Sequence, residues 1–194
     1  MTKKVLIIGA ESTGKSTLTH DLSLYYRKKG HLISDMQEFA RSWIDHQLDG
    51  DMNRLKFEHI THFGKTQMEL VRLVEEKVKR VSIIFSDTDA IVSSVFQKIY
   101  YDKIDEELLT IANNEKWDLI LFTQPDVPWV DDGQRDLGDR REEINEIFKK
   151  ELEKRNFEYI EIKGNWEERF NTAVNAVDSI LMGKNSLHNN VNMI

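Results

Sequence analysis

The chain of 194 residues contains no cysteine. Disulfide bonds, thiolate nucleophiles and cysteine-based zinc sites are therefore excluded, and the absence is compatible with a reducing compartment. Long hydrophobic runs are also missing, since no apolar stretch approaches the ~20 residues that a membrane-spanning helix requires. The first strand-like run begins at residue 4, which leaves no room for a secretion signal before it. These absences predict a soluble, cytoplasmic protein without a membrane partner.

Positive charge is in short supply, because 27 Lys and Arg residues face 34 Asp and Glu residues, giving a formal net charge of -7. A nonspecific nucleic-acid surface needs clustered cations to neutralise phosphates, so nucleic acid is not an expected partner. The length and the 40% hydrophobic content suit one α/β domain. We expect this domain to span residues 1–182, and the asparagine-rich segment 183–194 to form a disordered tail.

The most informative stretch is GAESTGKS at residues 9–16, directly after the apolar run Val5 to Ile8. It matches the phosphate-loop pattern G-x-x-x-x-G-K-[ST], in which backbone N–H groups curl around phosphate oxygens. Lys15 is expected to reach the β- and γ-phosphates of a nucleoside triphosphate, and the Ser16 hydroxyl to ligate Mg²⁺. The predicted nucleotide contacts in this stretch are Gly9, Glu11, Ser12, Thr13, Gly14, Lys15, Ser16 and Thr17.

Strand-like runs occur at 4–8, 32–35, 81–86, 118–123 and 157–162, with helical patterns between most of them, including a long one over 54–80. This alternation predicts an α/β, three-layer fold of the P-loop NTPase and nucleoside-kinase type, with a central parallel five-stranded sheet. Most apolar residues of the long helical region are expected in the core; its apolar positions include Leu55, Ile60, Phe63, Met68, Leu70, Leu73 and Val78. Ligands of such sheets collect beyond the carboxyl ends of the strands, so the residues there are the functional candidates.

Acidic residues end the third predicted strand in the sequence Ser86-Asp87-Thr88-Asp89. Asp87 is predicted to hold or orient Mg²⁺ beside the phosphate loop, as P-loop enzymes do with a carboxylate at a strand tip. Asp89 has two open interpretations: it addresses the acceptor hydroxyl, or it caps the helix that begins near Ala90.

Glu38 and Arg41 follow the second predicted strand and are spaced to share a helical face. Glu38 is a candidate base or sugar ligand and Arg41 a candidate substrate contact, with a plain surface ion pair as the alternative. His59 and His62 also share a helix face, but the HExxH spacing of a zinc site is absent and no metal is expected there.

The stretch 129–141 is polar, punctuated by glycines and rich in arginine. It predicts a mobile lid that brings Arg135, Arg140 and Arg141 to the transferring phosphoryl group and excludes water. A simple connecting loop is the alternative.

The motifs GAESTGKST, QEFAR, SDTDA, PWVDDGQRDLGDRREE and YIEIKGNWEERF, in this order, resemble the ribosylnicotinamide kinase domain of the NadR family over residues 3–181. The resemblance implies ATP-dependent phosphorylation of the 5'-hydroxyl of nicotinamide riboside, with Mg²⁺. It implies that Lys15, Asp87, Asp89, Glu38, Arg135 and Arg141 act in catalysis, and that Asn165 and Trp166 contact adenine. It places Glu38, Arg41, Gln67, Asp89, Trp129 and Asp132 at the riboside, where Trp129 either stacks on the pyridinium ring or packs in the lid.

One departure from the family concerns the second activity of its bifunctional members, an adenylyltransferase domain with an HxGH signature. His59-Ile60-Thr61-His62 lacks the glycine of that signature, so phosphorylation without NAD synthesis is expected. Two alternatives stay open: a kinase of another nucleoside or small metabolite, and a nucleotide-dependent regulatory ATPase. The run Phe122 to Asp126 carries no N-K-x-D guanine reader, which disfavours a GTPase. The oligomeric state is left open.

Overall fold

A computed structural model describes residues 1–130 and 137–183. Asp132 and Arg135 of the expected lid, and the expected tail beyond Gly183, lie outside the described residues. The strands are β1 Lys3–Gly9, β2 Ile33–Met36, β3 Ile83–Asp87, β4 Leu119–Thr123 and β5 Ile160–Ile162. The α-helices are α1 Lys15–Lys28, α2 Phe39–Leu48, α3 Phe57–Lys77, α4 Ala90–Tyr101, α5 Glu106–Asn114, α6 Arg141–Lys154 and α7 Trp166–Leu181, with 3-10 turns η1 Met52–Arg54 and η2 Gly138–Arg140.

All the strand pairs of the sheet are parallel, in the order β2-β3-β1-β4-β5. The α/β prediction and its five parallel strands are therefore confirmed. Strand β1 lies in the centre between β3 and β4. Strands β2 and β3 lie on one side of β1, and the later strands β4 and β5 lie on the other side, so the strand order reverses at β1. Such a switch point leaves a crevice beyond the carboxyl ends of the strands, which is where the phosphate loop follows β1.

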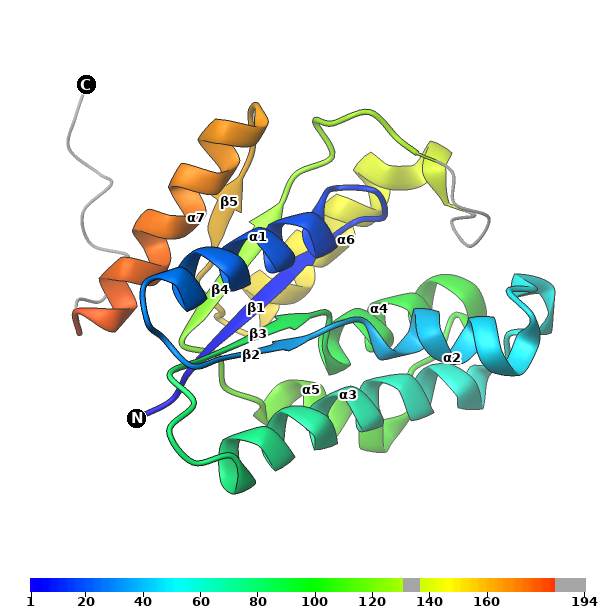
Figure 1. Cartoon of the computed structure of the whole chain (residues 1–194). Coiled ribbons are helices and arrows are strands. Elements are labelled where there is room, and N and C mark those ends of the chain that lie inside the picture. The colour runs from blue at the N-terminus through cyan, green and yellow to red at the C-terminus, as the bar shows by residue number, and fades with distance from the viewer. Residues whose placement is uncertain (131–136, 184–194) are drawn as a thin grey trace.

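Side chains of the central strands alternate between two apolar layers, as a sheet covered on both faces requires. Val5 and Ile7 of β1 pack with residues of α1 and α7, whereas Leu6 and Ile8 pack with residues of α3 to α6. Figure 1 shows α1 and α7 on one side of the sheet and α3, α4 and α5 on the other. The three layers that the sequence predicts are confirmed.

Helices α2 and α3 form a smaller apolar cluster beyond the edge of the sheet, built on Ile44, Leu48, Ile60 and Phe63. The long helical prediction over 54–80 is confirmed as η1 and α3. Of its apolar residues, Ile60, Phe63 and Met68 are buried, whereas Leu73 and Val78 are exposed. Both lie near the end of α3, which extends past the region that packs on the sheet.

His59 and His62 of α3 lie against Trp43, with ring centroids 4.8 and 6.1 Å away. Within the described ranges, no group of three or more His, Cys, Asp or Glu residues could hold a metal ion. No helix among the described residues is long and apolar enough to cross a membrane.

Candidate functional site

The phosphate loop joins the end of β1 to the start of α1 and needs its two glycines for different reasons. At Gly9, a Cβ atom would lie 2.3 Å from Thr123 Oγ1 and 2.5 Å from the Thr123 carbonyl oxygen, so only glycine permits β4 to approach. Gly14 has a φ of 82° at the N-cap of α1, a left-handed conformation that glycine adopts readily. The loop therefore turns tightly and directs the N-terminus of α1, with its unpaired N–H groups, toward an anion.

Ser16 and Asp87 meet at the mouth of this loop. Ser16 Oγ in the first turn of α1 donates to Asp87 Oδ2 at the end of β3 over 2.5 Å. The register of the sheet accounts for this meeting, because Asp87 pairs with Ile7 of β1, two residues before the loop. Asp87 is completely buried. A hydroxyl and a carboxylate are hard oxygen donors of the kind that Mg²⁺ takes when phosphates complete its shell, so the two residues fit this ion.

Lys15 is the cation of the loop, and its Nζ donates to the Ala10 carbonyl oxygen over 2.8 Å. The side chain thus bends back across the loop instead of extending away from it. No acidic residue occupies the first turn of α1 to oppose the helix dipole. Lys15 and the unpaired N–H groups at the start of α1 therefore supply the positive charge of the loop.

Thr88, between the two acidic residues, has a φ of 73°. This value is unusual for a β-branched residue and costs free energy, so a surrounding network must hold it. Ser86 Oγ donates to the Thr88 carbonyl oxygen over 2.8 Å, and Gln67 Nε2 donates to Ser86 Oγ over 3.1 Å. The buried side chains of Gln67 and Ser86 therefore hold the turn after β3 in this conformation.

Asp89 is the N-cap of α4, and the capping alternative is the correct one. Its Oδ1 accepts from the N–H groups of Ile91 and Val92 at 2.9 and 3.1 Å, and its Oδ2 accepts from Trp117 Nε1 at 3.1 Å. The side chain is 1% exposed and is not among the described residues that line the site cavity. Burial raises the pKa of Asp89 to about 6, against the lowering effect of these three donors. Helix capping and Trp117 therefore use both oxygens of Asp89, and a role of Asp89 toward the acceptor stays a prediction.

A cavity of about 160 Å³ opens beside the phosphate loop. Every predicted nucleotide contact from Gly9 to Thr17 lines it, together with Glu38, Arg41 and Gln67. The rest of its described wall contains the polar residues Thr88 and Ser93 and is otherwise apolar and aromatic. The apolar and aromatic residues come from α2, from η1 and the residue after it, from α3 and from α4. They are Ala40, Ile44, Met52, Leu55, Ile60, Phe63, Val92, Phe96 and Tyr100.

The polar candidates of this cavity are brought together as the sequence predicts. Arg41 Nε lies 3.8 Å from Glu38 Oε2, and both groups line the cavity. Gln67 is 2% exposed and links two elements, since its Oε1 accepts from Phe39 N over 3.1 Å while its Nε2 donates toward β3. Gln67 therefore fixes the start of α2, which carries Glu38 and Arg41, relative to Asp87.

The described ends of the expected lid are attached to the phosphate loop. Ser12 Oγ accepts from Val130 N over 2.9 Å, and Glu11 Oε2 accepts from Leu137 N over 3.4 Å. Trp129 packs against Gly138, where a Cβ atom would lie 2.7 Å from its ring, and it is not among the described residues lining the cavity. Of the two open interpretations of Trp129, the structure favours packing in the lid.

Arg141 is not an extended lid cation. It begins α6, is 9% exposed, and its Nη2 donates to the carbonyl oxygens of Ser12, Pro125 and Val127 at 3.3, 3.1 and 2.9 Å. The guanidinium thus joins the phosphate loop to the segment after β4, while a catalytic role for Arg141 stays a prediction. Arg140 instead pairs with Glu143 on the surface of α6.

The loop after β5 lies against the phosphate loop from the other side. The ring of Trp166 lies 3.3 Å from the position that a Cβ atom would take on Gly14. Asn165 caps α7, because its side chain accepts from Glu168 N over 3.0 Å while Asn165 N donates to Glu168 Oε2 over 2.8 Å. Trp166 thus lies beside the phosphate loop but is not among the described residues that line the cavity, and the Asn165 side chain serves the helix.

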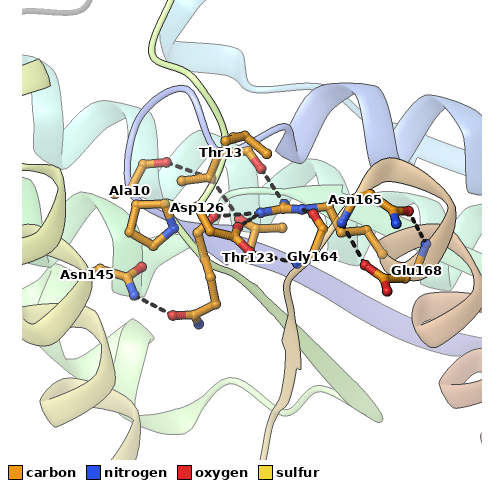
Figure 2. A network of polar contacts seen from close by, with 12 residues as sticks. Ala10, Thr13, Thr123, Asp126, Asn145, Gly164, Asn165 and Glu168 are labelled. Atoms are coloured by element: carbon orange, nitrogen blue, oxygen red, sulfur yellow. Dashed lines mark hydrogen bonds and ion pairs between the residues drawn. The ribbon is translucent and has the colours of Figure 1, made fainter.

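Arg169 is the residue that sequence reasoning missed. It is 1% exposed and hydrogen-bonds to Thr13, Gln124, Asp126 and Gly164, which come from three different loops (Figure 2). In the sequence it follows two glutamates on a helix and looks like a surface residue. The only signal is indirect, since an arginine one turn into α7 faces the same edge of the sheet as the phosphate loop.

Known proteins share sequence and fold with this chain. The chain is 26% identical over 182 residues to the trifunctional NAD biosynthesis/regulator protein NadR of Escherichia coli K12, covering 92% of this chain and 43% of that protein. The chain thus spans less than half the length of the curated relatives that it matches.

Solved structures of NadR in complex with NR, and with NAD and AMP-PNP, match with TM-scores of 0.75 and 0.72 at 24% and 23% identity. They cover 94% and 92% of this chain, and it covers 52% and 49% of them. Thymidylate kinase of Ehrlichia chaffeensis matches at a TM-score of 0.61 and 13% identity, over 89% of this chain and 97% of that one. The fold is therefore that of P-loop kinases. A family model described as "AAA domain" matches residues 4–169, so the chain belongs to this P-loop family and is a homologue of part of NadR.

Proposed function

We propose that the protein transfers the γ-phosphoryl group of ATP to the 5'-hydroxyl of nicotinamide riboside, giving nicotinamide mononucleotide. The observation that carries the proposal is the continuity of the site: the phosphate loop with Ser16 and Asp87 opens directly into the cavity that Glu38 and Arg41 line. The γ-phosphoryl group of ATP and the 5'-hydroxyl of the riboside could then meet directly, with no protein group between them. The proposal is also supported by the homologous NadR, whose structures contain NR or an ATP analogue.

The donor half needs little beyond positioning and electrostatics, because phosphoryl transfer is catalysed mainly in these ways. Backbone N–H groups of the loop and Lys15 would hold the triphosphate. Ser16 and Asp87 would hold Mg²⁺, which when bound neutralises charge on the phosphates. The bond between the γ-phosphorus and its bridging oxygen breaks, a bond to the 5'-oxygen forms, and ADP leaves.

The acceptor half is an apolar and aromatic chamber with one acidic corner. Phe63, Phe96 and Tyr100 offer ring surface to a flat base, and the cation of a pyridinium ring is attracted to such faces and to a carboxylate. Glu38 lines the cavity on the side of α2, whereas Glu11 lies in the phosphate loop. We assign to Glu38 one of two roles: it accepts the proton of the 5'-hydroxyl, or it accepts a hydrogen bond from a sugar hydroxyl. These rings replace Trp129 as the proposed stacking partners of the nicotinamide.

The test is an ADP-release assay with purified full-length chain, MgATP and a panel of acceptors, with mass spectrometry of the product. We expect turnover with nicotinamide riboside to exceed that with deoxynucleosides, and no NAD to form from the mononucleotide and ATP. A clear preference for thymidine or another nucleoside would show that the proposed substrate is wrong but that the protein is still a kinase. ATP hydrolysis that no acceptor stimulates would favour a regulatory ATPase.

Two variants test the donor half. Lys15→Ala and Asp87→Asn should each lower kcat by about 10²–10³-fold, because each removes charge placed at the reacting phosphates. Asp87→Asn should also raise the Mg²⁺ concentration that gives half-maximal activity. Lys98→Ala is the matched control, since Lys98 is an exposed lysine paired with Asp102 on α4. Activity of Lys15→Ala equal to that of the control would contradict the proposed donor site.

A further inference from the structure

Arg169 of α7 is a fully buried arginine that the proposed reaction leaves without a role. A guanidinium is almost never buried unless each of its donors finds an acceptor, since desolvation of the charge is costly. In this structure its Nε donates to the Gly164 carbonyl oxygen over 3.0 Å, and its Nη1 donates to the Thr13 carbonyl oxygen over 3.0 Å. Its Nη2 donates to the Gln124 carbonyl oxygen over 2.9 Å and contacts Asp126 Oδ1.

These acceptors belong to three segments that meet at the carboxyl edge of the sheet (Figure 2). Thr13 lies in the phosphate loop after β1, Asp126 lies in the segment after β4, and Gly164 lies in the loop between β5 and α7. One planar group with fixed donor directions therefore sets the relative positions of all three. A lysine could satisfy only some of these acceptors at once.

Asp126 also holds the loop between β5 and α7, through the N–H group of Gly164. Its Oδ2 accepts from Gly164 N over 2.6 Å, while its Oδ1 pairs with Arg169. Both the N–H and the carbonyl of Gly164 are thus held by this ion pair.

The consequence concerns the base-side loop, which we define as Gly164, Asn165 and Trp166. Gly164 has a φ of 91°, and the loop ends with the Trp166 ring against Gly14 of the phosphate loop. Trp166 is 39% exposed, so part of its ring faces solvent beside the place where the nucleotide binds. A rigid aromatic face at this place stacks on a base with little further loss of conformational freedom.

We propose that the Arg169–Asp126 pair is a positioning element for the nucleotide base: it holds the base-side loop against the phosphate loop and so sets the affinity for the base of the triphosphate. The inference rests on the proposed function only in taking the phosphate loop as the nucleotide site. It assigns to Arg169 no contact with the reacting atoms. The part of the ligand that it governs is the base, while Lys15 and the loop N–H groups govern the phosphates.

Binding of two ligands separates these contributions. Calorimetric titration of the full chain with MgATP measures base and phosphates together, whereas titration with magnesium tripolyphosphate measures the phosphates alone. In Arg169→Met we expect the Kd for MgATP to rise about tenfold or more while the Kd for tripolyphosphate changes less than about twofold. Arg169→Lys should recover part of the loss, because an ammonium can still reach one or two of the acceptors.

Steady-state kinetics give a second readout. The KM for ATP should rise in Arg169→Met, with kcat and the KM for the acceptor within about twofold of the wild type. The matched control is Arg155→Met, which removes an arginine whose side chain is 6% exposed and pairs with Glu151 at the far end of α6 from Arg141. Both variants should lower the unfolding temperature, but Arg155→Met should leave both Kd values unchanged.

Three results would overturn the inference. An equal loss of affinity for MgATP and tripolyphosphate would show that Arg169 shapes the phosphate loop alone. Unchanged affinity for both would show that the pair only stabilises the fold, and so would a loss in Arg155→Met that matches that in Arg169→Met. If Arg169→Met does not fold, Asp126→Asn serves instead, with the same pattern expected at about threefold or more, since Asp126 is 40% exposed. Because these titrations need no acceptor, a chain that fails to phosphorylate nicotinamide riboside but shows this pattern refutes the proposed function and supports the inference.

Discussion

The buried carboxyl group of Asp89 should make the stability of this protein depend on pH in a direction opposite to that of most carboxylates. Asp89 caps α4 and accepts from Trp117, and burial raises its pKa to about 6. The unfolded chain has an aspartate pKa of about 3.9. Between these values the folded protein binds the proton more strongly than the unfolded chain does. The associated stability is therefore fully present below about pH 4 and is lost as the pH rises through about 6.

The magnitude follows from the difference of about 2 between the two pKa values, which corresponds to about 3 kcal/mol in the free energy of unfolding. Between pH 7.5 and pH 4.5 about 2 kcal/mol of this is gained, because the unfolded chain is still mostly ionised at the lower pH. In a domain of this size 1 kcal/mol moves the unfolding temperature by about 2–4 °C, so the gain corresponds to about 4–8 °C.

The assay compares Asp89→Asn with the wild type by thermal unfolding at several pH values. The variant keeps an oxygen for Ile91 and Val92 but turns an N–H group toward Trp117, which costs about 1–3 kcal/mol while a buried charge is removed. Both effects shift the stability of the variant by an amount that does not depend on pH, because the introduced asparagine does not titrate. The unfolding temperature of the wild type minus that of the variant should be larger at pH 4.5 than at pH 7.5.

A difference that stays constant from pH 4.5 to 7.5 would refute this account of Asp89. Asp102→Asn is a control of opposite sign, because the hydrogen bond and charge of Lys98 lower the pKa of Asp102. Its contribution is present above the unfolded pKa and is lost as the pH falls, and it is small because both side chains are exposed. The half-maximal Mg²⁺ concentration should be unchanged in Asp89→Asn, in contrast to Asp87→Asn.

Three further predictions concern packing and the wall of the site. Gly64→Ala should lower the free energy of unfolding in urea by about 1–3 kcal/mol, because the new Cβ would lie 2.5 Å from Leu108 Cδ1. Lys4→Met should lower it by about 2–3 kcal/mol, since Glu115 is 6% exposed and would keep only one of its cationic partners. Gln67→Leu should raise the KM of the acceptor by about threefold or more and leave the KM for ATP unchanged, because the start of α2 loses its link to β3. An unchanged acceptor KM in this variant would contradict the role of Gln67.

The sequence predicts the architecture well because the hydrophobic pattern of each central strand is unambiguous. Val5 to Ile8 are apolar on both faces, as a strand buried between two helical layers requires. The last strand is shorter than its pattern suggests, over Ile160–Ile162 instead of 157–162, because it lies at the edge and pairs only with Leu121 to Thr123 of β4. The length of an edge strand depends on its neighbour, which the local sequence does not specify.

The candidate site could be predicted where a motif encodes backbone geometry. The meeting of Ser16 with Asp87 follows from the phosphate loop and from the parallel register of β1 and β3. Asp89 and Arg141 could not be assigned in this way. Their charges suit a ligand equally well, and only tertiary contacts with Trp117 and with loop carbonyl groups show that they serve the fold.

Two buried arginines, Arg141 and Arg169, bind carbonyl oxygens of the protein itself, which affects the charge of the cavity. Arg141 and Arg169 both donate to carbonyl oxygens of the loops that surround the phosphate loop. The cations among the described residues that line the cavity are then Lys15 and Arg41. Lys15 lies in the phosphate loop and Arg41 lies 3.8 Å from Glu38, so the Arg41 and Glu38 side chains offset each other's charge. Under the proposed function, this balance suits a cationic riboside better than an anionic acceptor. An acceptor that already carries a phosphate would need further positive charge beside Arg41 and Glu38.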